Sequence, residues 1–216
     1  MSNFSIDILS PDRLGKVTAS RCDVLFPARD AKKGIDNLAW ELANEYLFGY
    51  TDTVSTWQTE HGLNNEYHAE KHYEQYYGGF GSRPDPIIDH ANQIAGSPDY
   101  LDITHNCGCD WKCPTSYANW SEWMRPGFEL SKNYYYQAQF YMFITGATLW
   151  KVCAYLTETL KMVDNGLVYP ITEEKRMIVI PVEPDKVFFD SLIERVRPVI
   201  EKRNEYIEVI TNRLKL

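Results

Sequence analysis

The stretch "GSPDYLDITHNCGCDWKCP", residues 96–114, sets aspartates, a lysine and three cysteines among short runs of strand-forming residues. Its turn-forming sequence "HNCG" predicts a β-hairpin whose loop lies near these four residues. In a strand, alternate side chains share a face, so Asp110 and Lys112 project together. Trp111 and Cys113 project to the opposite face. The stretch therefore predicts a strand with one charged face and one apolar face.

The charged face allows two interpretations. If Asp99 lies across the hairpin turn, it converges with Asp110 and Lys112, and two carboxylates so close repel each other unless a cation lies between them. Carboxylate oxygens are ligands that suit Mg²⁺ or Mn²⁺. The alternative is a surface hairpin with an ordinary pair of Asp110 and Lys112. Spacing alone leaves both interpretations open.

The cysteines raise a third interpretation, an iron–sulfur or zinc knuckle built on Cys107, Cys109 and Cys113. An iron–sulfur cluster needs four thiolates, and Cys22 or Cys153 would have to come from distant parts of the sequence. Because the cysteines of the strand alternate with the charged positions, they are expected on its apolar face, where a thiol behaves as a small hydrophobic group. We therefore expect thiols packed in the core or a loop.

Composition limits the class of protein. The chain has 216 residues, 44% of them hydrophobic, which is enough for one well-buried core, so a single domain over residues 1–216 is expected. No apolar run reaches membrane-spanning length, and the N-terminal sequence lacks the pattern of a signal peptide. An odd count of five cysteines favours a reducing compartment. We expect a cytoplasmic protein without a membrane partner. The net charge of −8 does not exclude a basic track for nucleic acid.

The hydrophobic pattern on both sides of the hairpin predicts a mixed fold. Helices are expected over residues 18–26, 34–49, 56–79, 116–124, 131–146 and 185–216, and strands over 148–156 and 176–182. Pro198 is an expected irregularity in the last helix. Strands flanked by helices on both sides predict an α/β (α+β) fold with a central mixed sheet.

Two further features border the hairpin. Glu66, Glu70 and Glu74 recur every four residues, a like-charge ladder that costs helix stability unless it is solvated or partly neutralised, for example by a metal ion. Gln137 interrupts the apolar run "YYYQAQFYMF", where a buried amide needs hydrogen-bond partners. The ladder is compatible with a solvated helix face, and Gln137 with a core amide bonded to the backbone.

Five motifs occur in order along the chain: "RLGKVTAS", "HGLNNEYHA", "GSPD", "DWKCPTS" and "GFELSKNYYYQAQFYMFITG". With these motifs the chain resembles, essentially from end to end, the phage lambda exonuclease and YqaJ family of viral recombination nucleases. That family has the restriction-endonuclease-like PD-(D/E)xK fold. A lone D-x-K motif is common by chance, whereas the ordered set is specific.

The resemblance implies a set of catalytic residues. Asp99 and Asp110 are expected to bind metal, and Glu66 to complete the acidic cluster. Lys112 is expected to orient or activate the attacking water. Gln137 is expected to hold that water or a phosphate. Phosphodiester hydrolysis needs an in-line nucleophile, charge neutralisation and a stabilised leaving group, all of which two cations bridged by carboxylates can provide.

The resemblance also implies a pocket for a terminal 5′-phosphate at Arg13 and Ser20, with Ser97 close to Asp99 in the sequence. Two positions depart from the family. Asp110 stands where many relatives carry Glu, so its carboxylate is one methylene shorter. The sequence "WQTEH" before Gly62 is more polar than in lambda exonuclease, where an apolar residue helps to part the strands. Trp57 is a candidate for that wedge, or else a core residue.

The expected function is a Mg²⁺-dependent exodeoxyribonuclease, with Mn²⁺ as a substitute, that digests the 5′-ended strand of duplex DNA ends. It would release 5′-mononucleotides and leave a 3′ overhang for a single-strand annealing protein in phage-type recombination. The resemblance implies a homotrimeric ring, for which Phe188, Leu192, Ile193 and Val196 are candidate packing positions, unless they cover the sheet within one subunit. The alternatives are a structure-specific or restriction-type endonuclease of the same fold and an inert DNA-end clamp.

Overall fold

The computed structural model describes residues 11–27, 31–49, 56–157, 163–164, 167–168 and 171–215. Contacts divide the chain into two compact units, each assembled from separate stretches. Unit 1 comprises Met1–Asp52, Pro86–Ser97 and Lys186–Leu216, and unit 2 comprises Thr53–Asp85 and Pro98–Asp185. The single domain expected over residues 1–216 stays a prediction.

Unit 1 combines a small sheet with two packed helices. Its elements are η1 (Pro11–Arg13), β1 (Val17–Thr18), η2 (Ala19–Leu25), α1 (Ala31–Phe48), β3 (Ile87–Asp89), β4 (Ile94–Gly96) and α5 (Lys186–Leu214). The sheet has the order β1-β4-β3, with β1 parallel and β3 antiparallel to β4. The helix expected over residues 18–26 is a 3₁₀ helix, and the Thr18 side chain makes no capping hydrogen bond.

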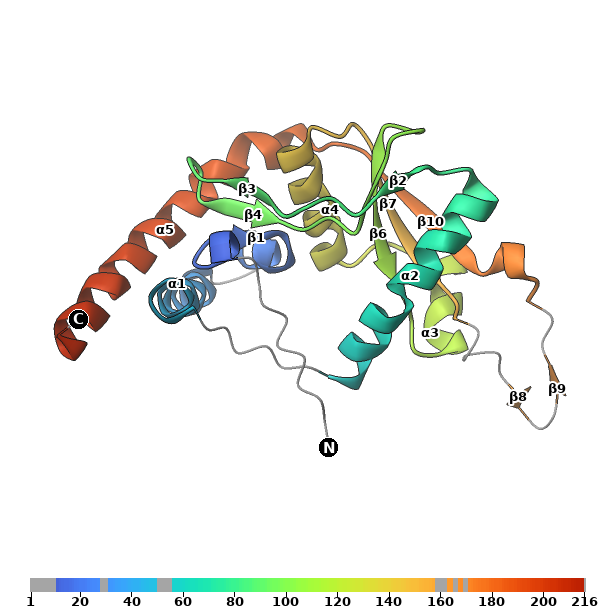
Figure 1. Cartoon of the computed structure of the whole chain (residues 1–216), viewed down its shortest axis with the longest axis horizontal. Helices are drawn as coiled ribbons and strands as arrows, with labels where there is room; N and C mark the ends of the chain where they lie inside the picture. Colours follow the sequence, from blue (N-terminus) through green and yellow to red (C-terminus); the bar gives the residue numbers. More distant parts are fainter. Residues whose placement is uncertain are drawn as a thin grey trace. The chain divides into compact units, whose positions relative to one another are not determined.

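Helices α1 and α5 pack along one another (Figure 1). In α5, Phe188, Leu192 and Val196 recur every four residues and are 2% exposed or less. Phe188 also stacks on Phe26, with ring centroids 4.7 Å apart. Of the two roles considered for these positions, packing within the subunit is the one that the three have, because they lie in the core of unit 1, whereas Ile193 is partly exposed. Pro198 lies inside α5 without ending it.

Unit 2 is built on a five-stranded mixed sheet. Its strands are β2 (Gly81–Ser82), β5 (Tyr100–Asp102), β6 (Cys107–Lys112), β7 (Trp150–Tyr155) and β10 (Met177–Val182). The order is β10-β7-β6-β5-β2, in which β6 and β7 are parallel and the other neighbours antiparallel. The remaining elements are α2 (Trp57–Tyr77), α3 (Tyr117–Ser121), η3 (Glu122–Met124), α4 (Lys132–Thr145), η5 (Glu173–Lys175) and the β8 (Val163–Asp164) and β9 (Leu167–Val168) pair.

Local sequence signals fix the ends of the two long helices of unit 2. The Thr56 side chain accepts a hydrogen bond from the backbone of Thr59 at the start of α2, and Ser131 does the same for Tyr134 at the start of α4. Gly78 and Gly146 end the helices with φ of 68° and 72°, a left-handed conformation that glycine adopts without a steric cost.

The predicted hairpin is confirmed as the antiparallel pair of β5 and β6. Tyr100 pairs with Cys109 and Asp102 with Cys107, which places the loop at residues 103–106. Cys107 and Gly108, expected in the loop, already belong to β6. Because Gly108 has no side chain, the indole ring of Trp150 packs directly on the strand, where an added Cβ would lie 2.0 Å from it.

The two faces of β6 pack against different helices. On one face Cys109 and Trp111 are buried in a cluster with Ala69 and Tyr73 of α2. The alternate residues of β6 point to the other face, where Lys112 bonds to Gln137 of α4. The expected division into an apolar and a charged face is confirmed. Within the described residues no helix is both long and apolar enough to cross a membrane.

Candidate active site

Three residues of the opening stretch converge beside α4. Asp99 lies just before β5, and its Oδ2 accepts a hydrogen bond of 2.9 Å from the backbone N–H of Trp111. The Asp110 carboxylate is near enough to raise the pKa of Asp99. Lys112 Nζ lies 2.5 Å from Asp110 Oδ2. The structure therefore brings both aspartates and the lysine together, as the hairpin predicted.

The electrostatics of this group are those of charges held out of water. Burial raises the pKa of Asp99 well above 3.8, and the neighbouring Asp110 and Glu66 raise it further. Burial alone would lower the pKa of Lys112, but the attraction of Asp110 and Asp99 outweighs it, and the net shift is upward. The lysine therefore stays charged, and the aspartates lie in a place that favours a further cation.

Gln137 of α4 belongs to the same group. Its Oε1 accepts a hydrogen bond of 3.3 Å from Lys112 Nζ, and its Nε2 donates one of 3.4 Å to the Tyr141 hydroxyl. Lys112 Nζ also lies 4.7 Å from the centre of the Tyr134 ring. The amide is thus satisfied by side chains of the cluster, and the core alternative with backbone partners does not describe it. That description fits Gln139, which bonds to the Glu183 carbonyl at 2.7 Å.

The three glutamates of the ladder on α2 have different ion-pair partners. Glu70 and Glu74 pair with Lys71 at 3.3 and 2.5 Å on the helix surface. Glu66 instead forms an ion pair with Arg83, whose Nη2 lies 3.9 Å from Asp99 Oδ1. The solvated-face interpretation therefore describes the later two glutamates, and Glu66 faces the aspartates through a guanidinium group.

Arg83 was not predicted from the sequence. It lies in the turn-rich stretch "GSRPDP", where no periodicity assigns a side chain to a face. One signal existed, since Arg83 is the only Lys or Arg between Lys71 and Lys112. A lone strong cation between acidic motif residues is a natural counter-ion for them.

The donor set fits a hard divalent cation at the two aspartates. Asp110 is 1% exposed and the Asp99 side chain 17%, and two carboxylates so poorly solvated repel each other unless a cation between them relieves that repulsion. Among the described residues no three His, Cys, Asp or Glu side chains gather into one metal-binding group. Glu66 thus stands apart from the pair of Asp99 and Asp110.

The residues expected at the 5′-phosphate lie in unit 1. Arg13 Nη1 donates a hydrogen bond of 2.9 Å to Ser97 Oγ, so these two are brought together. Ser20 Oγ lies 3.3 Å from Thr18 Oγ1. In the parallel register Thr18 is opposite Ala95, so Ser20 and Ser97 follow at the same end of the strand pair.

The cysteines of the hairpin lie in the core. Cys107, Cys109 and Cys153 are buried in the cluster under α2, and all five cysteines are free thiols. Burial raises the pKa of Cys113 to about 12, so that thiol is protonated at neutral pH. These positions match the expectation of packed thiols.

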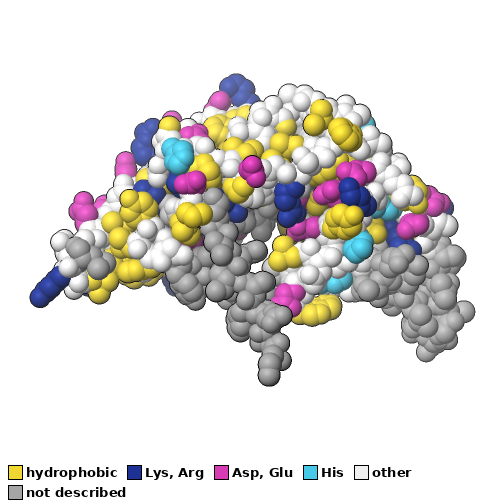
Figure 2. Space-filling model, viewed as in Figure 1, with side chains coloured by type: hydrophobic (Ala, Val, Ile, Leu, Met, Phe, Trp, Pro, Cys, Tyr) yellow, Lys and Arg dark blue, Asp and Glu magenta, His cyan; other side chains and the backbone are white. Residues whose placement is uncertain are grey.

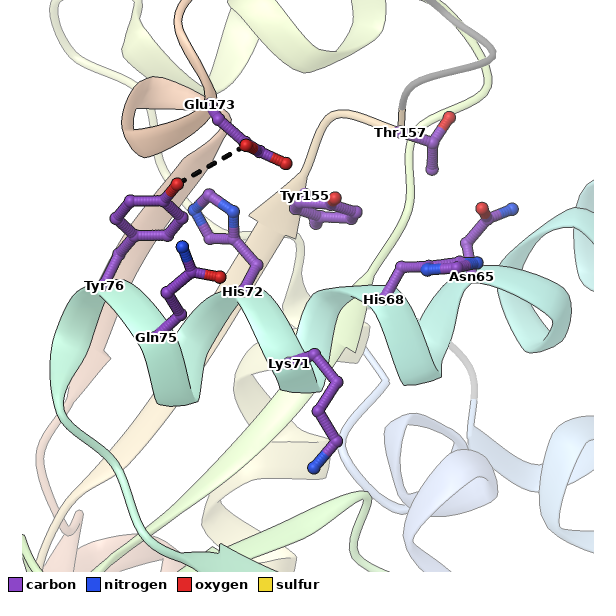
Figure 3. A pocket seen from close by; sticks show the side chains of 9 residues that line it. All are labelled: Asn65, His68, Lys71, His72, Gln75, Tyr76, Tyr155, Thr157 and Glu173. Carbon is purple, nitrogen blue, oxygen red and sulfur yellow. Dashed lines mark hydrogen bonds between the residues drawn. The ribbon is translucent and has the colours of Figure 1, made fainter.

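A cavity of about 320 Å³ lies on another face of α2 (Figure 3). It is lined by Asn65, His68, Lys71, His72, Gln75, Tyr76, Tyr155, Thr157 and Glu173. The Tyr76 hydroxyl donates a 3.5 Å hydrogen bond to Glu173 across it. None of the expected catalytic residues lines this cavity.

The distribution of charge on the surface is relevant to the expected binding of DNA. Acidic and basic side chains are interspersed over the face shown in Figure 2, without one continuous patch of either sign. Trp57, the first residue of α2, is 63% exposed, so its alternative interpretation as a core residue is wrong.

A mixed sheet flanked by helices, with an aspartate and a lysine two residues apart on β6 beside a second aspartate, defines the PD-(D/E)xK class of nuclease folds. The sequence profile of the YqaJ-like viral recombinase domain matches residues 10–148, and the chain belongs to this family. The fold class and the family expected from the sequence are both confirmed.

Solved structures share the fold over nearly the whole chain. An alkaline exonuclease from Laribacter hongkongensis has a TM-score of 0.75 at 20% identity, covering 94% of this chain and 95% of that one. Its complex with dAMP has a TM-score of 0.74 at 22% identity, covering 95% and 96%. A phage-related exonuclease from Haemophilus somnus 129PT has a TM-score of 0.65 at 18% identity, covering 92% and 96%. No curated protein sequence matches the chain.

Proposed function

We propose that this protein is a Mg²⁺-dependent 5′-to-3′ exodeoxyribonuclease acting on linear double-stranded DNA. It releases 5′-mononucleotides and leaves a 3′ single-stranded overhang. The observation that supports the proposal is the convergence of Asp99, Asp110 and Lys112 at β6, in a chain of the YqaJ-like family. The likeness in fold to exonucleases supports the same activity.

Each residue of the cluster has a distinct task. Asp99 and Asp110 would hold the Mg²⁺, for which Mn²⁺ would substitute, and the bound cation supplies charge neutralisation at the phosphate and a more acidic water. Lys112 orients or activates that water, which it can do because its ammonium group is fixed between Asp110 and Gln137. Gln137 holds the water or a phosphate oxygen.

At the DNA end, Arg13, Ser20 and Ser97 bind the terminal 5′-phosphate. A guanidinium group can donate two hydrogen bonds to one phosphate, and each hydroxyl adds a donor. Each cleavage that leaves a 3′-hydroxyl exposes a new 5′-phosphate for the same contact. The protein would work in the cytoplasm as a homotrimeric ring around DNA and pass its overhang to a single-strand annealing protein.

A comparison of linear and covalently closed circular duplex tests this proposal. With Mg²⁺ the wild type should degrade the linear DNA and leave the closed circle intact, and EDTA should stop the reaction. Asp110→Asn should be inactive in both cases because it loses a charged ligand. Cleavage of the closed circle would establish an endonuclease instead. Binding of DNA ends without any hydrolysis would establish a clamp.

A further inference from the structure

Arg83 bridges the glutamate of α2 and the aspartate that precedes β5. Its Nη2 is paired with Glu66 Oε2 and lies 3.9 Å from Asp99 Oδ1. Its Nε also donates to the Asp99 carbonyl at 3.5 Å. The guanidinium group therefore lies within ion-pair distance of both carboxylates.

This contact differs from an ordinary surface ion pair. Exposed pairs contribute little because water screens both partners. Here the Glu66 side chain is 18% exposed and that of Asp99 17%, whereas Arg83 is 53% exposed. The acids are half-buried and the arginine reaches in from solvent, as a counter-ion for an acidic site does.

The charge balance of the cluster favours a single metal ion. Glu66, Asp99 and Asp110 carry three negative charges when ionised, and Arg83 and Lys112 carry two positive ones. One divalent cation turns the net charge from minus one to plus one, which a single phosphate group then neutralises. Two divalent cations would leave a large excess of positive charge at short range, which is unfavourable.

We propose that Arg83 is a positioning residue that supplies the positive charge between Glu66 and Asp99, so that each chain binds one divalent cation at Asp99 and Asp110. Glu66 then serves to anchor Arg83 and is not a ligand of a second cation. This inference rests on the proposed metal-dependent nuclease function. It places a permanent guanidinium group where it can also donate hydrogen bonds to an incoming phosphate.

Mn²⁺ binding to the full chain without DNA, followed by electron paramagnetic resonance, tests the proposal. The wild type should bind one Mn²⁺ per chain. Arg83→Gln should bind two, since Glu66 and Asp99 are then both available to a second cation. Arg83→Lys, which keeps the charge, should stay at one. The double variant Arg83→Gln, Glu66→Gln should return to one, because it lacks the additional carboxylate.

The matched control is Arg125→Gln, which removes an arginine of the same unit that pairs with Glu122 on the surface at 3.1 Å. It should bind Mn²⁺ like the wild type. Two Mn²⁺ in the wild type, or one in Arg83→Gln, would overturn the role of Arg83 and leave the nuclease proposal standing. A wild type that binds no Mn²⁺ at millimolar concentration would overturn both.

Discussion

The Lys112 side chain is held by several contacts at once. It touches a carboxylate, an amide and an aromatic ring at once, and each contact comes from a different residue. Such confinement costs conformational entropy, which a lysine on the surface would retain. A fixed ammonium group of this kind is what the role proposed for Lys112 requires.

Replacing Lys112 by alanine should reduce DNA hydrolysis by about 10²–10⁴-fold, the usual contribution of a positioned proton-transfer group. Folding and DNA binding should persist, because the aspartates and the hairpin remain. Initial rates on linear duplex measure the effect, and circular dichroism checks the fold. Lys175→Ala, an exposed lysine of η5, is the control that should keep full activity. Near-normal turnover of Lys112→Ala would remove this lysine from the chemistry.

Arg13→Ala tests the pocket for the DNA end. Loss of a charge-assisted contact of about 2–3 kcal/mol should slow digestion of 5′-phosphorylated duplex by roughly thirtyfold to a hundredfold at limiting substrate. On 5′-hydroxyl ends the variant and the wild type should be similarly slow. Equal rates of the two proteins on phosphorylated ends would exclude Arg13 from binding the terminal phosphate.

Among the individual residues of the site, the sequence predicted that Asp99, Asp110 and Lys112 come together. The alternation of β6 places Asp110 beside Lys112 without any tertiary information, and the hairpin brings Asp99 to them. Arg83 could not be predicted in this way, because its position depends on the path of a turn-rich stretch. Its contact with Glu66 spans 17 positions of sequence and two elements, a relation that no periodicity encodes.

At the scale of elements, the β5–β6 hairpin depends on a buried carboxylate. Asp102 is 2% exposed and accepts hydrogen bonds from the Tyr73 hydroxyl at 2.7 Å and from the His105 backbone at 3.1 Å. Its Oδ2 also lies 2.6 Å from His105 Nδ1. Burial would raise the pKa of Asp102, but the bonds from Tyr73 and His105 outweigh it and lower the pKa below 3.8.

Asp102→Asn should therefore lower the free energy of unfolding at neutral pH by about 2 kcal/mol, since charge-assisted hydrogen bonds become neutral ones. The sign of the pH dependence follows from the lowered pKa. The wild-type advantage is present above pH 3.8 and disappears as the pH falls through the lower pKa of the folded state. Urea unfolding at pH 7 and near pH 3 measures both; a constant difference between the proteins would contradict the assignment.

Alanine substitutions at two glycines are expected to change the stability of the protein in opposite directions. Gly108→Ala should destabilise the protein by about 1–3 kcal/mol, because the new methyl group would overlap the Trp150 ring and force β6 and β7 apart. Gly62→Ala, inside α2 with no atom within 4 Å of its added Cβ, should stabilise by about 0.5–1 kcal/mol. Thermal unfolding compares them. Similar melting temperatures for the two variants would argue against close packing at Gly108.

The sequence predicted the long helices and the paired strands well, because caps, glycines and apolar periods mark them locally. It placed a full helix over residues 18–26, where the structure has the tighter 3₁₀ form. It also left open whether the apolar stripe of α5 packs against other subunits or within its own. That stripe is covered by η2 and α1, elements that lie more than a hundred residues earlier in the sequence. Which surface an amphipathic helix covers is decided by tertiary packing.

At the scale of the whole molecule, residues of both units are needed for the proposed reaction. The proposed catalytic group belongs to unit 2 and the proposed phosphate pocket to unit 1, and the chain passes from Ser97 to Asp99 through Pro98 alone. The family and fold are established over most of the chain. In the proposed reaction the direction of digestion depends on both sets of residues, so it is the property that tests the two assignments together.

Linear duplex DNA labelled at either its 5′ or its 3′ ends, with 5′-phosphates and Mg²⁺, gives the most direct test. The 5′ label should be released first, as mononucleotide, while the 3′ label stays in long single strands. Release of the 3′ label first, or equal rates on 5′-phosphate and 5′-hydroxyl ends, would contradict a 5′-to-3′ exonuclease guided by the terminal phosphate.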